Sequence, residues 1–592
     1  MKITRWSALL ATAAVGALIL AGCSSEKESE VVSGTSITVA QNSSFNAMNA
    51  FTSTSYSTYN SNIAYLFQST FNYYDDTPSL VKNTKFGSYK KISSDPLVVK
   101  YTVNPGVKWT DGTAVNASDL LLNWAASISK YNATDVNFGS IFTGSGLDLV
   151  TKVPKISDDG RAITMIFDKP FVDWEVSFQP NMPASATWEL SGIDKKTGAD
   201  AQKAVIKAIQ SDNTAQLAKL AATYKDGFNL DGTPSDKRVL VTNGPFKVQK
   251  LVKDQYVTLV ANPDYTWGPM PKVSKITVRF IPDQTGQVQA LQNGEVSIIS
   301  GQATADTVNA LKQVKGVSSK TSANASYEHV DLTFNNKGPF DPATYGGDAA
   351  KALAVRQAFF KVLPRQTMLD RLIKPLNSKA VLANSSLFLP GQDGYEKSTA
   401  ENGSADYAKV DVAAAKALLA KAGVTTPVTV KFAYATDNPR RANEFQLIQS
   451  SAKEAGFDVV DVGKTGALFF DAETGIGTGK YDYDACVFAY ALSSLSVTQS
   501  EANTTTGNPY NYNGYSNPEV DKLWAQAKVA SGIKAAIPLQ QQIDKHILQD
   551  AASISLFTLP DVAAWSNKVK NVKNAPLTPN VFWNFFDWEV TK

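Results

Sequence analysis

The chain has 592 residues, of which 43% are hydrophobic, which is enough to bury the cores of about two or three domains. Its 57 basic and 54 acidic residues leave a formal net charge of only +3. This near balance argues against a nucleic-acid-binding protein, because that role needs a concentrated positive field.

The N-terminus has the pattern of an export signal. Lys2 and Arg5 precede an uncharged, alanine- and leucine-rich stretch that is too short for a comfortable membrane span. The stretch ends in Leu20-Ala21-Gly22-Cys23, which resembles the cleavage and lipidation site of bacterial lipoproteins. We therefore expect residues 1–22 to be removed and Cys23 to carry a lipid that anchors the protein to the outer face of the cell membrane.

Small and polar residues fill positions 23–36, which predicts a flexible tether behind the anchor. Strands and helices then alternate along the whole chain. Strands are predicted at 37–41, 97–103, 162–167, 257–260, 276–281, 428–436, 458–462 and 484–491. A helix capped by Asn116 follows the turn at Asp111-Gly112, and further helices begin after Asp411, Asn438 and Asn517. Helices are also expected at 284–293 and 467–472.

This alternation predicts a mixed α/β fold with two lobes, each with its own core, and a ligand site between them. Residues 195–240 differ, because two helices rich in alanine, lysine and glutamine precede a loop of glycine, aspartate and proline. We expect this segment to be a surface appendage rather than part of the core.

Reactive residues do not cluster in the sequence. His329 and His546 are the only histidines, and neither has the spacing of a metal site. Cys486 lies in an apolar run, which favours a buried and inert thiol. Without a nucleophile and a matching base, the sequence gives no support for an enzyme and predicts no cofactor or metal.

Six short motifs, in order along the chain, resemble the family 5 extracytoplasmic solute-binding proteins, which serve ABC importers of peptides and nickel. They are Gly106–Thr113, Asn243–Phe246 with Asn262–Tyr265, Ala290–Ser297, Val355–Phe359, Ala414–Gly423 and Tyr515–Asp521. Each motif is weak alone, but their order and spacing behind a lipoprotein signal are typical of that family.

The resemblance implies a periplasmic-binding-protein-like fold, with two lobes and an extra domain around a ligand cleft and a two-strand hinge. On this basis, lobe I comprises residues 37–68, 240–324 and 560–592. The extra domain covers 69–239 and carries the appendage at 195–240, and lobe II covers 325–559. A lipid-anchored monomer of this kind would capture a peptide-like or larger polar solute and deliver it to ABC permease subunits, without binding nucleic acid.

The sequence departs from the dipeptide binders of this family at two strand ends. Ser493 stands roughly where those proteins have an aspartate for the ligand amine, and Tyr434 stands near the expected arginine. We therefore expect a cleft of aromatic and hydroxyl groups formed by Tyr434, Tyr490, Ser493 and Ser494, with Phe45 facing them from lobe I. Core packing is an equal alternative for each aromatic residue taken alone.

Two other functions remain alternatives. Actinobacterial proteins with this general pattern are linked to envelope glycolipid assembly, so a role in that process is the second hypothesis. A secreted hydrolase on an α/β scaffold is the third, and it would need a nucleophile and base that two scattered histidines do not supply.

Overall fold

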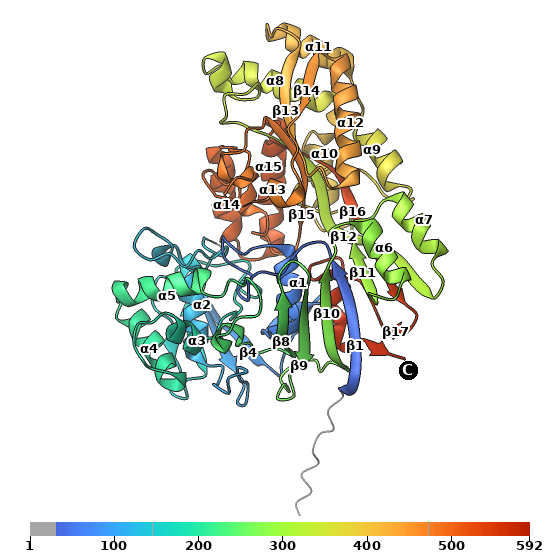
Figure 1. The fold of residues 1–592 in the computed structure, drawn as a ribbon. Helices are drawn as coiled ribbons and strands as arrows, with labels where there is room; N and C mark the ends of the chain where they lie inside the picture. Colours follow the sequence, from blue (N-terminus) through green and yellow to red (C-terminus); the bar gives the residue numbers. More distant parts are fainter. Residues whose placement is uncertain (1–30, 145, 472, 592) are drawn as a thin grey trace, which may run out of the picture.

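The computed structural model describes residues 31–144, 146–471 and 473–591, and these form a mixed α/β fold around one large sheet (Figure 1). The strands of this sheet follow the order β14-β13-β15-β12-β16-β11-β1-β10-β9-β8. Their bounds are β1 Val32–Gln41, β8 Phe246–Val252, β9 Tyr256–Ala261, β10 Val273–Phe280, β11 Ile298–Gly301, β12 Val317–Leu332, β13 Val428–Ala433, β14 Phe457–Asp461, β15 Ala485–Ala491 and β16 Ser553–Ser566. The predicted mixed α/β class is confirmed.

Three smaller sheets and a set of helices complete the architecture. The small sheets pair β4 (Gly87–Ser94), β5 (Leu97–Val103), β7 (Ala162–Ile166) and β6 (Lys155–Ile156), then β2 (Asn72–Tyr74) with β3 (Leu80–Lys82), and β17 (Val569–Lys570) with β18 (Glu589–Val590). The helices are α1 Thr58–Phe67, α2 Ala117–Ser127, α3 Ala184–Leu190, α4 Gly198–Gln210, α5 Thr214–Asp226, α6 Gln284–Gln292, α7 Ala305–Gln313, α8 Ala349–Lys361, α9 Arg365–Met368, α10 Tyr395–Glu401, α11 Val412–Lys421, α12 Pro439–Glu454, α13 Gly466–Phe469, α14 Pro518–Lys528 and α15 Ile533–Gln549.

The predicted signal peptide (1–22) and Cys23 lie outside the described residues, as does most of the predicted tether. The end of that tether needs correction, because β1 begins at Val32 and not at Ile37. Val32 pairs with Val273 of β10, and the Thr35 side chain accepts a hydrogen bond from the backbone N–H of Ser274 at 3.0 Å. Small polar residues suggested a free segment, but here they sit at the edge of a paired strand.

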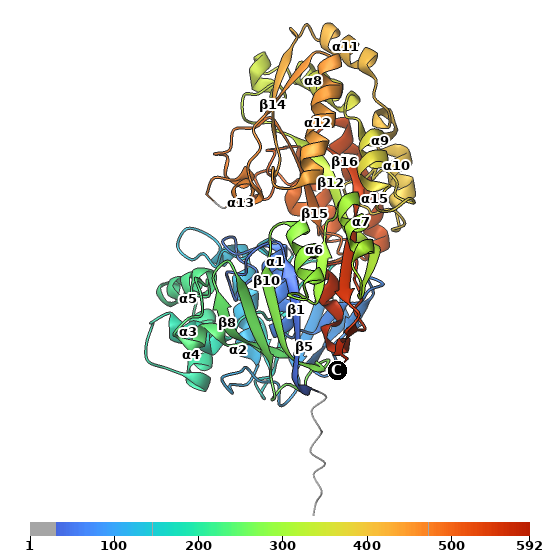
Figure 2. The same cartoon turned by 45° about the vertical axis from the view of Figure 1, so that its right-hand side comes forward.

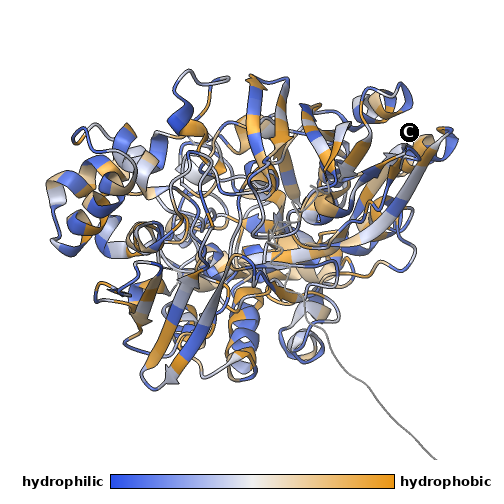
Figure 3. Ribbon diagram, turned by 90° about the horizontal axis from the view of Figure 1, so that it is seen from below, coloured by the Kyte–Doolittle hydropathy of each residue, from blue (hydrophilic) through white to orange (hydrophobic). Residues whose placement is uncertain are grey.

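Helix starts follow the capping residues closely. Asn116 and Asp119 form a capping box at α2. The Asp119 side chain accepts a hydrogen bond from the backbone N–H of Asn116, and the Asn116 side chain accepts one from the backbone of the first helical turn. The side chains of Asn438 and Asn517 accept hydrogen bonds from backbone N–H groups in the first turns of α12 and α14. Strand faces follow the two-residue period, so apolar and polar residues alternate along several strands in Figure 3.

Buried side chains gather in two large clusters. The first core draws its residues from positions 37–298 and 569–588, and it joins β1 and β8–β10 to the four-stranded sheet and α1–α5. The second core draws its residues from positions 330–559 and joins β13–β15 to α8, α11, α12, α14 and α15. A smaller cluster fixes α6 and α7 beside β11. Two bodies with separate cores are therefore present (Figure 1).

Strands β12 and β16 connect the two bodies, and Figure 2 shows β16 running from the upper body to the lower one. Residues 317–323 of β12 pair with 566–560 of β16. The register then shifts between Ala323 and Tyr327, and pairing resumes from Tyr327 opposite Thr558 into the second core. A second register shift follows between Glu328 and His329, so the ladder that joins the bodies is interrupted close to the place where one core gives way to the other.

The expectation that residues 195–240 form a surface appendage is wrong. Ala201, Val205, Ala208 and Ile209 of α4 are buried in the first core, as are Leu217, Leu220, Ala221 and Tyr224 of α5. Their spacing of three and four residues is that of an amphipathic helix with one packed face. Small alanine side chains made this stripe easy to miss in a composition rich in lysine and glutamine.

Within residues 31–144, 146–471 and 473–591, no helix is long and apolar enough to cross a bilayer.

Candidate functional site

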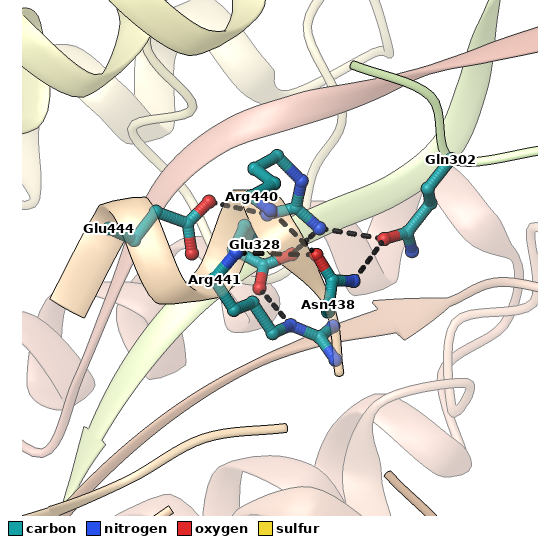
Figure 4. Close-up of polar contacts among 6 residues, drawn as sticks. All are labelled: Gln302, Glu328, Asn438, Arg440, Arg441 and Glu444. Atoms are coloured by element: carbon teal, nitrogen blue, oxygen red, sulfur yellow. Dashed lines mark hydrogen bonds and ion pairs between the residues drawn. The ribbon is translucent and has the colours of Figure 1, made fainter. Parts of the chain in front are cut away.

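Several polar contacts join the bodies at the surface where they meet, which we call the boundary, and two groups of them stand out. The first group centres on Gln302, which follows β11. Its side-chain oxygen accepts a hydrogen bond from the guanidinium of Arg440 at 2.7 Å and one from Nδ2 of Asn438 at 3.3 Å (Figure 4). The strand end beside the first core is thereby tied to the first turn of α12.

The second group centres on Asp173, in the segment between β7 and α3. Its carboxylate accepts hydrogen bonds from the N–H groups of Val497 and Thr498, both at 2.9 Å, and from the Thr498 hydroxyl at 2.8 Å. Burial raises the pKa of Asp173, although these hydrogen bonds act to lower it. The neighbouring Val172 N–H donates to the Lys528 carbonyl at 3.0 Å. The Asp173 contacts hold the segment after β15 against the first body, and the Val172 contact holds the end of α14 there.

Aromatic side chains also meet across the boundary. Tyr56, just before α1, is 46% exposed, and its ring lies edge-on to that of Tyr510 at a centroid distance of 6.3 Å. Ring contacts then continue from Tyr510 to Tyr512 at 6.3 Å, to Phe488 at 6.1 Å and to Tyr490 at 5.0 Å. Partly exposed aromatic faces between two bodies are a common lining of small-molecule and peptide sites.

A buried charge cluster underlies the start of α12 (Figure 4). Glu328 of β12 is fully buried and accepts a hydrogen bond from Nε of Arg441 at 2.7 Å, while Arg440 pairs with its other oxygen at 3.0 Å. Arg440 also pairs with Glu444, one turn along the helix. Burial alone would raise the pKa of Glu328, but the two arginine charges lower it to about 2. Burial raises the pKa of Glu444 to about 7.

Tyr59 brings the first body close to this cluster. It lies in the first turn of α1, whose cap Ser57 accepts a hydrogen bond from the N–H of Asn60, and it is 36% exposed. The pKa of its hydroxyl is raised by burial, lowered by the positive charge of Arg441 and raised by the negative charge of Asp437. The first turn of α1 therefore presents a partly exposed tyrosine on the first body.

The predicted site residues separate into two groups. Tyr490, Ser493 and Ser494 lie together at the end of β15, with Tyr490 partly exposed and Ser493 exposed. Ser494 is engaged within its own segment, where its hydroxyl donates to Gln499 at 2.6 Å.

Tyr434 and Phe45 are packed into the two cores instead. Tyr434 is 5% exposed, stacks on Phe445 at 4.9 Å and donates its hydroxyl to Asp461 at 2.8 Å. Phe45 is 2% exposed and packs edge-on against Phe67 at 5.9 Å. The expectation that these two rings face the opposite lobe is corrected, because a large ring just beyond a buried strand finds more apolar contact by folding back into the core.

The main boundary residues that sequence reasoning missed are Tyr56, Tyr59, Glu328, Arg440 and Arg441. One signal for the arginines was available. The first turn of a helix favours acidic residues, because it lies at the positive end of the helix dipole. Two consecutive arginines there contradict this local preference, which indicates that tertiary partners hold them.

Hollows occur within the second body, and one of them reaches Tyr490. A cavity of about 20 Å³ beside Tyr327, Asp331 and Tyr490 has room for about one water molecule. An open groove of about 400 Å³ lies at the far end of the second body, lined by Lys337, Lys351 and the ends of α11 and β13 (Figure 1). Buried charges and exposed rings converge at the boundary rather than at the groove.

His329 and Cys486 carry potentially reactive groups, but both side chains are packed among other side chains. The ring of His329 stacks on Tyr490 at 4.6 Å, and its Nε2 lies 3.3 Å from an oxygen of Asp331. Cys486 is buried as predicted, and burial raises the pKa of its thiol. No group of three or more His, Cys, Asp or Glu side chains suited to a metal ion occurs in the part of the chain that the structure describes.

Comparison with known proteins gives consistent matches over nearly the whole chain. The model of the bacterial extracellular solute-binding proteins, family 5, matches residues 77–496. An uncharacterised lipoprotein of Mycobacterium tuberculosis is 23% identical over 541 residues, which span 88% of this chain and 87% of the relative. The oligopeptide-binding protein OppA of the same species is 24% identical over 506 residues, spanning 84% and 75% of the two chains.

Solved structures share the fold. The periplasmic EDTA-binding protein EppA superposes with a TM-score of 0.78 at 20% identity, covering 94% of this chain and 97% of its own. The oligopeptide-binding protein AppA of Bacillus subtilis, in complex with a nonapeptide, has a TM-score of 0.72 at 18% identity and coverages of 94% and 99%. The two-lobe arrangement is therefore common to these proteins and to this chain.

Proposed function

Because the chain belongs to the bacterial extracellular solute-binding proteins of family 5, we propose that it captures a peptide-like or larger polar solute and delivers it to the permease subunits of an ABC importer. The observation that carries this proposal is the boundary itself, where exposed tyrosines and a buried charge cluster meet between two bodies. The relatives named for oligopeptide binding support a peptide-like solute. The role needs no catalytic group, and we propose that the protein has none.

The two bodies act as lobes that close around the solute, with β12 and β16 as the hinge. The sequence predicts limits of the lobes between residues 324 and 325 and between residues 559 and 560. Both limits fall where the register between β12 and β16 is interrupted, which supports this view. Closure also requires that the contacts of Gln302 and Asp173 form or tighten when the lobes approach. The extra domain at 69–239 shares its hydrophobic core with lobe I and would move with it.

A monomer anchored by a lipid on Cys23 would hold the lobes outside the cell membrane. The N-terminal pattern Leu20-Ala21-Gly22-Cys23 supports this anchor, and relatives of the chain are named lipoproteins. Metabolic acyl labelling of wild-type protein and of Cys23→Ala tests it. Label should be lost in the variant, and retained label with membrane association would contradict a Cys23 anchor.

Capture is tested by small-angle scattering with and without a tryptic digest of casein, a mixture of peptides of many lengths. We expect a smaller radius of gyration with the digest, together with a rise in melting temperature, since a ligand stabilises the state that it binds. The dipeptide Ala-Ala should give no rise. Tyr490→Ala should weaken binding of the retained peptides by about 1–3 kcal/mol through lost buried area. No change in either quantity with the digest would contradict the proposal.

A further inference from the structure

Two stretches of the chain are strongly basic, although the protein as a whole is nearly balanced in charge. Residues 307–327 and 562–586 contain six lysines and no aspartate or glutamate. The two stretches are neighbours in space, because residues 317–323 of β12 pair with 566–560 of β16. Asn567 also donates its backbone N–H to the Gly316 carbonyl at 2.8 Å. The lysines of both stretches are thereby brought to one region of the surface.

Five of these lysines lack a counter-charge, and we call them the lysine strip. They are Lys312 at the end of α7, Lys315, Lys320, Lys568 and Lys570. All five are exposed, and none of them forms an ion pair with a residue that the structure describes. The sixth, Lys573, lies 3.9 Å from a carboxylate oxygen of Asp76. Exposed charges of one sign in one region create a positive field that attracts an anionic partner.

The strip lies beside the point where the N-terminal part of the chain enters the fold. β1 begins at Val32, whose N–H donates to the Lys272 carbonyl at 2.8 Å. The ammonium group of Lys272 pairs with Glu589 at 2.6 Å, and Glu589 lies opposite Lys570 in the β17–β18 pair. A continuous series of contacts therefore links the start of β1 to the strip. Figure 1 shows both β17 and the start of β1 at the lower end of the first body.

The lipid expected on Cys23 would be close to this region. Cys23 stands nine positions before Val32, so even a fully extended chain between them spans at most about 30 Å. Attraction between lysines and anionic headgroups fades within a Debye length, which is about 8 Å at physiological ionic strength. The strip would thus need to be held near the bilayer in order to bind it, and a lipid on Cys23 holds it there.

We propose that the lysine strip is the membrane-facing surface of the anchored protein, and that it binds anionic phospholipid headgroups beside the anchor. This inference rests on the Cys23 anchor of the proposed function and adds an orientation to it, with the lower end of the first body against the bilayer. A soluble polyanion would meet the same charges. The bilayer is favoured because the anchor confines it beside the strip.

The test measures how accessible each lysine is on vesicles. Lipidated protein purified from membranes is reconstituted into vesicles of phosphatidylcholine, with or without phosphatidylglycerol, and its lysines are acetylated with a water-soluble reagent. Mass spectrometry gives the rate at each lysine. We expect the strip to react at least about threefold more slowly when phosphatidylglycerol is present. High salt should remove this difference, because it screens the attraction.

Other lysines serve as internal controls. Lys416 and Lys421 are exposed on α11, at the opposite end of the molecule (Figure 1). They should react at the same rate on both kinds of vesicle. A difference that is equal at α11 and at the strip would reflect a general effect of the vesicles and would contradict the proposed orientation.

Variants tie the difference to the strip. The strip variant carries Lys315→Gln, Lys568→Gln and Lys570→Gln, and it keeps Lys312 and Lys320 as reporters. The slowing at these two lysines should be largely lost, because most of the local positive charge is gone. The matched control removes three exposed lysines of the second body, with Lys409→Gln, Lys416→Gln and Lys421→Gln. It should leave the slowing at the strip unchanged. Melting temperatures confirm that both variants are folded.

Four results would overturn the inference. Equal acetylation of the strip on both kinds of vesicle would do so while leaving the anchor and solute capture intact. A slowing at Lys312 and Lys320 that survives in the folded strip variant would exclude the removed charges. Slowing by inorganic polyphosphate in solution, but not by phosphatidylglycerol, would assign the strip to a soluble polyanion. Finally, if acyl labelling shows no lipid on Cys23, the inference falls with the anchor.

Discussion

Helices α12 and α14 begin with the same two residues, Asn-Pro, but they have different roles. Asn438 accepts hydrogen bonds from the N–H groups of Arg440 and Arg441 at 3.1 and 3.2 Å, and Asn517 accepts one from the N–H of Glu519 at 3.0 Å. Beyond the cap, the helices diverge. The first turn of α14 carries acidic residues that suit the helix dipole, whereas that of α12 carries two arginines that oppose it.

The difference separates what the local sequence determines from what the tertiary structure adds. A capping asparagine and a proline are sufficient to start either helix. The arginines of α12 depend on Glu328, which is more than a hundred residues away along the chain. Residues that contradict a local preference therefore indicate a partner supplied by the tertiary structure.

The largest expected difference between the helices comes from removing their acidic partners. Glu328→Ala leaves two buried arginines short of a counter-charge and should lower the free energy of unfolding by about 3–5 kcal/mol. Glu519→Ala removes an exposed pair with Lys522 and should cost about 0–1 kcal/mol. Urea denaturation of both variants measures this. Equal losses would mean that the α12 cluster is no more than a surface ion pair.

The free energy of unfolding should also depend on pH through Glu444 of α12, with a smaller effect than the loss of Glu328. Burial raises the pKa of Glu444 to about 7, so the folded state holds a proton that the unfolded state loses above about pH 4.5. This contribution is fully present at low pH and is lost as the pH rises through 7. Between pH 5 and 7, wild type should lose on the order of 1–3 kcal/mol relative to Glu444→Gln. If the free energies of unfolding of the two proteins changed equally with pH, the raised pKa of Glu444 would be contradicted.

The caps themselves should behave alike in stability and differently in binding. Asn438→Ala and Asn517→Ala should each cost about 1 kcal/mol of unfolding free energy, because each removes a side-chain acceptor at a helix start. Only Asn438 also contacts Gln302 across the boundary. Asn438→Ala should therefore weaken retention of casein peptides, with Asn517→Ala as the matched control. An equal effect of both caps on retention would remove α12 from the site.

Much of the fold could be predicted from short-range signals. The strand at Leu97–Val103 and the capping box of Asn116 and Asp119 are where the sequence indicates, because each depends on residues a few positions apart. The start of β1 was missed because Gly34 disfavours a strand, and the pairing partner β10 lies far along the chain. The site was harder still. Tyr490 is partly exposed as expected, whereas whether Phe45 and Tyr434 face a cleft or a core depends on packing that a strand pattern does not contain.

The most direct test of the account is a crystal structure of the protein with the casein peptide that it retains most strongly. We predict that the peptide lies at the boundary, with Tyr56 and Tyr490 beside it. A peptide bound in the groove lined by Lys337 and Lys351, with the boundary empty, would contradict it.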